Sequence, residues 1–440
     1  MQRIEIRNFG PIKELNLDIK DFMLFIGPQA SGKSTIAKTI FFFKSLNDDL
    51  VKFLMALLEK NESSKFPIRS FEKVVRQKFL DYFGSSIPLR ELNLNYKYTE
   101  NTWITITLEE RHSYITPKFS KEFVNSIYQL SQRTIEFSKS IDKRNTSLLS
   151  SKDLLLIEND KRKFISQLTI NCNELFKEER ELIFIPAGRS LLATLSDQLQ
   201  FIEPRRLDFL MRTFVNKINL LRPMFNKSLN DLITARMVLT QSEIEFSKIR
   251  LAEKLIHKIL KGKYKFDQDG EKIFIGETQK YVKLNFASSG QQESLWILLL
   301  LFIVILEQQN VFIVIEEPEA HLFPEAQKDI SALISLLSNM KQSQVIITTH
   351  SPYILASINN LIMANKAGKK YPEKVMPKIN KHLWLNRAKI FAALVQEGIV
   401  EEIIDREFDI IQQEQIDSVS RVINNEFDFL YQIGIDDAQM

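Results

Sequence analysis

Alternating and continuous apolar patterns at the start of the chain predict strands followed by a helix. Residues 4–6 and 15–19 alternate apolar with polar or charged side chains on either side of a turn at 8–11, as strands with one buried face do. Residues 22–26 are continuously apolar, which is typical of a strand buried on both faces. Residues 34–43 then read as a helix. The segment predicts strand, loop and helix in that order.

The middle of the chain predicts an antiparallel layer and a helical insertion. Residues 92–98 and 103–108 alternate apolar and polar positions around a short turn, which indicates a hairpin. Residues 121–180 are charged and helical in pattern, 182–185 form a short apolar strand, and 207–261 are mostly helical. These segments separate the strand and helix at the start of the chain from the strands and helices of its last third.

The last third returns to alternating strands and helices. Short strands are expected between 263 and 286, and a long apolar helix begins near Gln291. Apolar strands at 311–315 and 344–348 flank a helix at 324–340, which predicts a parallel sheet. We therefore predict an α/β fold with a mixed sheet.

Composition limits the class of protein without naming a partner. The 440 residues are 44% apolar and 26% charged, enough for a large core. A net charge of +4 permits contact with DNA without arguing for it. Cys172 is the only cysteine, so an intramolecular disulfide is excluded and a cytoplasmic location is expected. The apolar run Leu295–Leu306 is shorter than the roughly 20 residues of a membrane span, which favours a buried helix and no membrane.

A phosphate-binding loop lies between the first buried strand and its helix. The sequence fits G-x-x-x-x-G-K-[ST], in which loop N–H groups wrap phosphates, Lys33 reaches the outer phosphates and the Ser34 hydroxyl helps to hold Mg²⁺. A chance match in a turn is the alternative, and the strand and helix on either side argue against it. The predicted nucleotide contacts are Gly27, Pro28, Gln29, Ala30, Ser31, Gly32, Lys33, Ser34 and Thr35.

Two later strands end in side chains that suit hydrolysis of a phosphate bond. Glu316 and Glu317 follow the strand at 311–315, and we assign Glu316 to Mg²⁺ and Glu317 to the attacking water. His350 follows the next strand and is placed beside the outer phosphate. The alternatives are a solvated acidic strand end and a structural histidine.

A second candidate anion site precedes the long apolar helix. Ser288, Ser289, Gly290 and Gln291 stand where helix N–H groups point outward. A plain helix cap without a ligand is the alternative. Since the chain already has a loop for its own phosphates, we expect this turn to serve the nucleotide of a facing protomer.

The order of these motifs resembles the ABC ATPases of the RecF, SMC and OLD group, over about residues 1–45 and 260–360. The resemblance implies an ABC ATPase head that binds ATP and Mg²⁺ in a head-to-tail homodimer or higher oligomer. It also implies that Glu319 and His321 approach the opposite site. Arg189 would be a phosphate or interface contact, with a surface ion pair as its alternative. This chain departs from the pattern at Ala287 and Ser289, before and at the start of the long helix, and at Glu316, which leaves the hydrolysis rate open.

The resemblance also suggests a biological setting. We divide the chain into an ATPase core of 1–45 and 262–440 and a second lobe of 46–261. The chain is similar to stand-alone OLD-like ATPases of Septu or PARIS type, which implies regulation of a separately encoded effector in anti-phage defence. Two alternatives stay open. One is a RecF-like repair ATPase that binds DNA through Lys254, Lys258 and nearby basic residues, and the other is a slowly hydrolysing ATP-dependent scaffold.

Overall fold

The computed structural model describes residues 1–60, 66–85, 91–108, 114–145, 151–194, 207–239, 245–276, 278–405, 407–412 and 424–431. The N-terminal half contains β1 (Arg3–Phe9), β2 (Ile12–Asp18), β3 (Phe22–Ile26), α1 (Lys33–Lys60), α2 (Pro67–Phe83), β4 (Leu92–Lys97), β5 (Trp103–Leu108), β6 (Thr116–Phe119), α3 (Lys121–Asn145), α4 (Ser151–Phe176), β7 (Glu181–Ile185), α5 (Ser190–Thr194) and α6 (Phe209–Leu221). The C-terminal half contains η3 (Arg222–Asn226), α7 (Leu229–Leu239), α8 (Phe246–Leu260), β8 (Gly262–Asp267), β9 (Gly270–Ile275), β10 (Tyr281–Lys283), η4 (Leu284–Phe286), α9 (Ser289–Glu307), β11 (Val311–Glu316), α10 (Pro324–Ser338), β12 (Gln344–Thr349), α11 (Pro352–Lys370), α12 (Pro372–Val375), η5 (Lys381–Leu383), η6 (Arg387–Lys389), β13 (Ile390–Gln396), β14 (Ile399–Glu402), β15 (Ile404–Asp405) and β16 (Ile410–Ile411).

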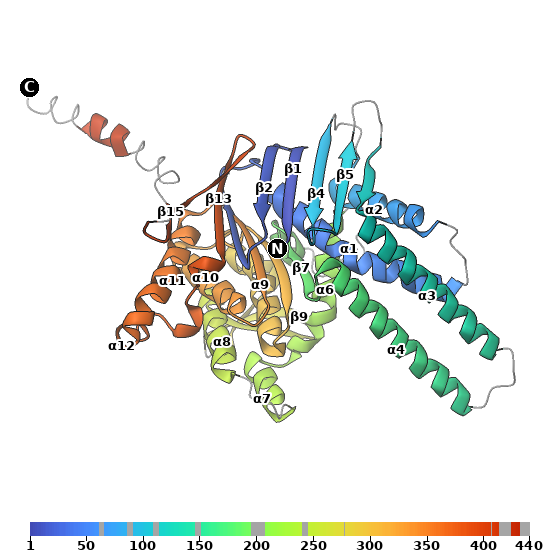
Figure 1. Ribbon diagram of the computed structural model, residues 1–440. Coiled ribbons are helices and arrows are strands. Elements are labelled where there is room, and N and C mark those ends of the chain that lie inside the picture. Colours follow the sequence, from blue (N-terminus) through green and yellow to red (C-terminus); the bar gives the residue numbers. More distant parts are fainter. Residues whose placement is uncertain are drawn as a thin grey trace, which may run out of the picture.

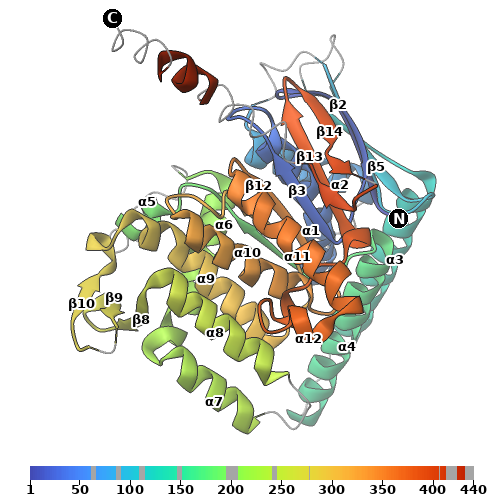
Figure 2. The same cartoon turned by 90° about the vertical axis from the view of Figure 1, so that its left-hand side faces the viewer.

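A six-stranded sheet in the order β14-β13-β3-β12-β11-β7 forms the centre of the molecule. Its strands are parallel except β14, which pairs antiparallel with β13 at one edge. Along β11, Ile313 and Ile315 point into the hydrophobic cluster of α9 and α10, whereas Phe312 and Val314 point into the cluster of α1. Helices therefore cover both faces, which explains why every residue of β3, β11 and β12 is buried. Figure 2 shows α8 to α11 gathered on one side.

The predicted antiparallel layer is a five-stranded sheet in the order β2-β1-β4-β5-β6. The hairpin of β4 and β5 has the expected register, with Leu94 opposite Ile106. Its apolar side chains pack in the same cluster as those of α1 and α2. This sheet lies above the parallel sheet in Figure 1, and α1 is the wall that both layers share.

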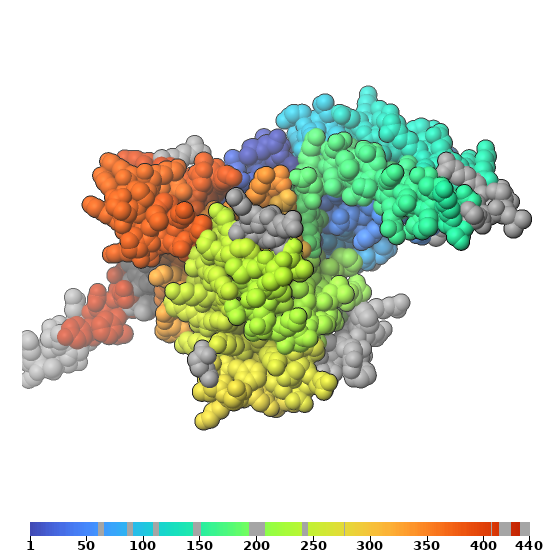
Figure 3. Space-filling view, turned by 90° about the horizontal axis from the view of Figure 1, so that it is seen from below, coloured from blue at the N-terminus to red at the C-terminus, as the bar shows by residue number. Residues whose placement is uncertain are grey.

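The predicted helical insertion includes a hairpin of α3 and α4 that projects from the body (Figure 1 and Figure 3). Phe137 and Phe164 stack between the two helices with ring centroids 4.0 Å apart. The Ser138 hydroxyl donates to the Leu58 carbonyl near the end of α1 at 2.9 Å. The hairpin is thus anchored on the helix that begins at the phosphate-binding loop.

The predicted α/β fold with its antiparallel layer and helical insertion is confirmed, but strands cross the predicted division at residues 45 and 261. β7, expected in the second lobe, is an edge strand of the parallel sheet beside β11. β1, expected in the core, pairs with β4 of the antiparallel layer. A smaller difference concerns the expected strand at 282–286, because β10 ends at Lys283 and Leu284–Phe286 is a short 3-10 helix.

The long apolar helix is buried, as its composition predicts. By length and composition α9 is long enough to cross a membrane. In the structure, all its residues from Glu293 to Leu306 are buried among other elements of the protein. Cys172 is buried as well, and burial raises the pKa of its thiol to about 12.

A buried ion pair ties α1 to the start of β7. The Lys44 ammonium lies 2.5 Å from the Glu178 carboxylate, and both side chains are almost completely buried. Arg180 also donates to Glu178, at 2.6 Å, and Lys44 donates to Gln2. Burial lowers the pKa of Lys44 to about 8, against the opposing effect of Glu178. The pair exists because each buried charge has partners that replace water.

We expect Lys44→Met to lower the free energy of unfolding by about 3 kcal/mol, because it removes one partner of a buried charge pair. Lys389→Met is the matched control, since Lys389 pairs with Asp21 on the surface and such pairs contribute less than about 1 kcal/mol. Urea denaturation measures both. Equal losses for the two variants would show that burial of the Lys44 pair has no special weight.

Candidate functional site

The phosphate-binding loop joins β3 to α1, and two of its glycines are required by space. A Cβ on Gly27 would lie 2.1 Å from the Val395 carbonyl oxygen, and one on Gly32 would lie 2.4 Å from Ile12 Cδ1. Their φ angles of 152° and 107° are also ones that L-residues rarely adopt. The neighbouring strand and loop therefore leave the backbone of 27–32 little choice of path.

Lys33 lies inside this loop and is mostly buried. Its ammonium donates to the carbonyl oxygens of Gly27 at 2.9 Å and Pro28 at 2.7 Å, and lies 3.5 Å from His350 Nδ1. Burial lowers the pKa of Lys33, while the carboxylates of Glu317 and Glu319 oppose that shift. The cation is thus held at the centre of the loop by weak neutral acceptors, which phosphate oxygens can replace.

Glu316 ends β11 with a carboxylate suited to a hard cation. Its Oε2 accepts from the Ala187 N–H at 3.3 Å, whereas Oε1 is buried without a hydrogen-bond partner among the described residues. Thr348 is opposite Glu316 on β12, and its buried hydroxyl also has no partner within the described segments. Alternation along β11 and β12 places both side chains on the face of the sheet that α1 covers, and Ser34 is in the first turn of α1. Unpaired oxygens of this kind fit the oxygen coordination of Mg²⁺, so Glu316 and Ser34 would hold it.

Glu317 and His350 meet at the ends of adjacent strands. Glu317 Oε1 lies 3.3 Å from His350 Nε2. The Glu317 N–H donates to the Thr348 carbonyl at 2.8 Å, and its φ of 43° turns the chain sharply out of β11. The structure therefore brings the three residues predicted for catalysis, Lys33, Glu317 and His350, into one chain of contacts.

The predicted second anion site forms the beginning of α9. Ser288 is the N-cap, its hydroxyl accepts from the Gln291 N–H, and the Gln291 side chain accepts from the Ser288 N–H. This is the arrangement of the plain helix cap that the sequence leaves as the alternative. Ser288 and Ser289 are exposed, so the turn is accessible to another molecule. Gly290 faces inward, since a Cβ there would lie 2.7 Å from the His321 carbonyl oxygen.

Arg189 has a different place from the predicted phosphate or interface contact. It is fully buried, and its guanidinium donates to the carbonyl oxygens of Pro186, Glu293, Glu316 and Glu317 and pairs with the Glu293 carboxylate. The Glu293 carboxylate also accepts from the backbone N–H groups of Arg189 and Ser190. The guanidinium makes four hydrogen bonds and one ion pair, so Arg189 joins β7, β11 and α9 and is not available to a phosphate.

We expect Arg189→Lys to destabilise the protein by about 2 kcal/mol. Lysine keeps the charge but has three N–H donors, so at least two buried acceptors lose their hydrogen bonds. Thermal and urea unfolding measure the loss, with Arg162→Lys as the matched control, because Arg162 forms an exposed pair with Glu158. Unchanged stability of Arg189→Lys would mean that charge alone suffices at this position.

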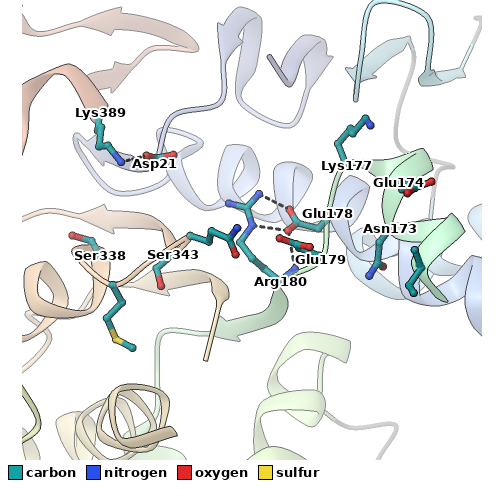
Figure 4. A pocket seen from close by; sticks show the side chains of 13 residues that line it. Asp21, Asn173, Glu174, Lys177, Glu178, Glu179, Arg180, Ser338, Ser343 and Lys389 are labelled. Carbon is teal, nitrogen blue, oxygen red and sulfur yellow. Dashed lines mark hydrogen bonds and ion pairs between the residues drawn. The ribbon is translucent and has the colours of Figure 1, made fainter. Parts of the chain in front are cut away.

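A cavity of about 670 Å³ lies away from these motifs (Figure 4). Its lining includes residues that precede strands, namely Asp21 before β3, Arg180 before β7 and Ser343 before β12. The phosphate-binding loop, Glu317 and His350 all follow the opposite ends of strands. Four of its charged side chains are paired with one another, Lys389 with Asp21 and Arg180 with Glu178. The cavity is therefore separate from the candidate site.

Part of the basic stretch around α8 is neutralised by nearby acids. Lys258 pairs with Asp329 at 2.8 Å, and Lys248 and Arg250 pair with glutamates of their own segment. The opposite face of α8 is buried in the core. This arrangement corresponds to a solvated helix face and does not favour the alternative of a DNA-binding groove at Lys254 and Lys258.

Two residues of the site, Glu293 and Thr348, were not found from the sequence, and Glu319 was expected in a different position. Glu293 carried a usable signal, because it is the only charged residue between 289 and 306 in an apolar helix. Thr348 and the inward position of Glu319 had no such signal, since their importance comes from strand neighbours and from a turn.

The strand-loop-helix unit of β3 and α1, with acidic side chains at the end of a parallel strand, defines a P-loop nucleoside-triphosphate-binding protein. The chain belongs to the AAA ATPase domain family, whose model matches residues 1–355. It is thus an ATP-binding protein of an ATPase family. No curated protein matches the sequence.

Solved structures with loose similarity are heads of SMC proteins. One is an SMC head bound to the C-winged helix domain of ScpA, with 11% identity, coverage of 93% of this chain and 99% of that chain, and a TM-score of 0.41. Another is the SMC head domain from Thermotoga maritima, with 13% identity, coverage of 91% and 97%, and a TM-score of 0.36. A third, from Pyrococcus furiosus, is an SMC head with an extended coiled coil bound to the C-terminal domain of ScpA, with 13% identity, coverage of 96% and 100%, and a TM-score of 0.38. TM-scores this low do not define the fold, which is established by the strand order of the sheets and by the geometry of the motifs.

Proposed function

We propose that this protein hydrolyses ATP with Mg²⁺ at the site formed by Lys33, Glu317 and His350. The observation that carries the proposal is the contact of these three side chains at the strand ends where Glu316 has a buried oxygen without a partner among the described residues. When bound, Mg²⁺ neutralises charge on the phosphates that the reaction separates. Glu316 and Ser34 would hold it.

The remaining steps fall to side chains of this chain. Lys33 binds outer phosphate oxygens in place of the loop carbonyls that it now contacts. Glu317 accepts a proton from the attacking water, and His350, placed between Glu317 and Lys33, orients the groups around the outer phosphate. The exposed fraction of the Glu317 and His350 side chains, 38% and 28%, leaves them open to substrate.

We further propose that ATP closes a head-to-tail homodimer or a higher oligomer. The exposed turn of Ser288 to Gln291 presents helix N–H groups, which attract phosphate, and the chain already has its own phosphate-binding loop. The economical arrangement is that each turn binds the nucleotide held by the facing copy.

The biological part of the proposal is regulation of a separately encoded effector, in the cytoplasm and in anti-phage defence. Its support is the order of the motifs, which resembles that of stand-alone OLD-like ATPases. The ion-paired surface of α8 is the reason to prefer a protein partner over DNA. Co-purification of the chain with the products of its genetic neighbours, with and without ATP, tests this part.

Lys33→Ala is expected to abolish ATP binding, because the loop loses its only cation.

Glu317→Gln is expected to keep ATP binding and to lower kcat at least about 100-fold, because an amide cannot accept the proton of water. The Gln variant should also accumulate an ATP-bound dimer. Equilibrium ATP binding, phosphate release and size-exclusion chromatography measure the three properties.

Glu316 provides the comparison, since it is the other acid at this strand end. Glu316→Gln should raise the Mg²⁺ concentration needed for half-maximal hydrolysis, because it weakens the binding of the cation, whereas Glu317→Gln should not change it. Hydrolysis by the Glu317→Gln variant at the rate of the parent would refute the assignment of the water-activating group.

Ser288→Arg is expected to block ATP-dependent dimer formation and to leave ATP binding by the monomer unchanged, because its bulk enters the proposed contact with the facing nucleotide. Ser288→Ala is the matched control: it removes the N-cap hydroxyl at a cost of about 1 kcal/mol without adding bulk. Ser289→Arg should still form the dimer. Analytical ultracentrifugation with ATP separates these cases, and a dimer of normal stability in Ser288→Arg would exclude the proposed contact.

A further inference from the structure

Glu319 points inward from the turn that follows β11. Its Oε1 accepts from the Thr349 hydroxyl at 2.6 Å and from the His350 N–H at 2.7 Å. Only 9% of the residue is exposed, and Oε2 is buried without a partner in the described part of the chain. This differs from the implied approach of Glu319 to an opposite site, since the carboxylate faces the strand end of its own chain.

Of the three contacts of His350, with Glu319, Lys33 and Glu317, the contact with Glu319 is the strongest. The ring of His350 lies 3.5 Å from Lys33 Nζ and 3.3 Å from Glu317 Oε1, which are long distances for hydrogen bonds. The bond from the His350 N–H to Glu319 is short and charge-assisted, and such bonds are about twice as strong as neutral ones. The backbone of His350 is therefore held even when Lys33 and Glu317 change partners.

The same turn also touches the beginning of α9. A Cβ on Gly290 would lie only 2.7 Å from the His321 carbonyl oxygen, so the turn packs directly on this glycine. Within the turn, the Ala320 N–H donates to the Glu317 carbonyl oxygen and the Leu322 N–H donates to the Glu319 carbonyl oxygen. One compact turn thus contacts the Ser288–Gln291 segment with its backbone and His350 with its carboxylate.

We propose that Glu319 is a positioning residue that holds His350 in place for hydrolysis and links it to the Ser288–Gln291 segment of the same chain. The inference rests on the proposed ATP hydrolysis. Glu319 itself touches neither water nor phosphate in this role, because it acts through the backbone of His350.

The first test is kinetic. Glu319→Ala removes both hydrogen bonds and is expected to lower kcat about 30-fold or more, as displacement of a reacting group by about 1 Å does, while ATP affinity stays within about twofold. Glu319→Gln keeps an acceptor oxygen of the same reach and should retain kcat within about threefold. Glu325→Ala, an exposed glutamate on α10, is the matched control. Parental kcat in Glu319→Ala, or equal loss of kcat in the Ala and Gln variants, would overturn the proposal.

The second test does not need ATP turnover. The imidazole signals of His350 are followed by NMR without nucleotide. They are assigned by comparison with the spectra of the His350→Ser and His350→Gln variants, in which these signals are lost. They should move in Glu319→Ala and keep their parental position in Glu319→Gln and Glu325→Ala. Unchanged His350 signals in Glu319→Ala, with native thermal unfolding, would mean that Glu319 acts only on a facing copy and would overturn the proposal.

The two tests separate the failure of this inference from that of the proposed function. If the parent neither binds nor hydrolyses ATP, the proposed function fails, and the NMR comparison still decides whether Glu319 places His350. If Glu317→Gln loses hydrolysis but Glu319→Ala does not, the ATPase proposal stands and the positioning role is excluded.

Discussion

The geometry of the site depends on the hydrogen bonds and the ion pair of the buried Arg189 guanidinium. The guanidinium donates to the carbonyl oxygens of both Glu316 and Glu317 and pairs with Glu293 at the start of α9. A buried charge is stable only when its donors are satisfied, so these acceptors have to stay where they are. These hydrogen bonds hold the sharp turn at Glu317, which has a φ of 43°. The turn directs the Glu316 carboxylate toward α1 and the Glu317 carboxylate toward His350.

The parallel sheet explains why the local motifs could be found in the sequence and their partners could not. The ends of β3, β11 and β12 each carry a local pattern of apolar run and polar residues, and strand order then brings Lys33, Glu317 and His350 together. Arg189 and Glu293 are 104 residues apart, and Glu319 meets His350 across 31 residues. No spacing in the sequence encodes such pairs, because they depend on how turns pack after the sheet has formed.

The same reasoning explains the predicted division into a core and a second lobe. Composition distinguishes charged helical segments such as α3 and α4 from apolar strands, and that part of the prediction corresponds to a real projection. It cannot show that β7 returns to the parallel sheet or that β1 leaves for the antiparallel one. Both layers share α1, and the Lys44 pair with Glu178 joins that helix to the start of β7. The two layers are therefore parts of one packed body.

Two independent connections join the Ser288–Gln291 segment to the catalytic end of the sheet in one chain. One is electrostatic, through Glu293 and Arg189 to the carbonyls of Glu316 and Glu317, and the other is steric, through Gly290 and the turn that carries Glu319. Rigid connections of this kind do not let the segment move without disturbing the carboxylates. If the segment binds the nucleotide of a facing copy, binding of the partner's nucleotide would change the position of the carboxylates at the strand ends of the same protomer. The fold thus provides a physical reason for the two sites of such a dimer to act together.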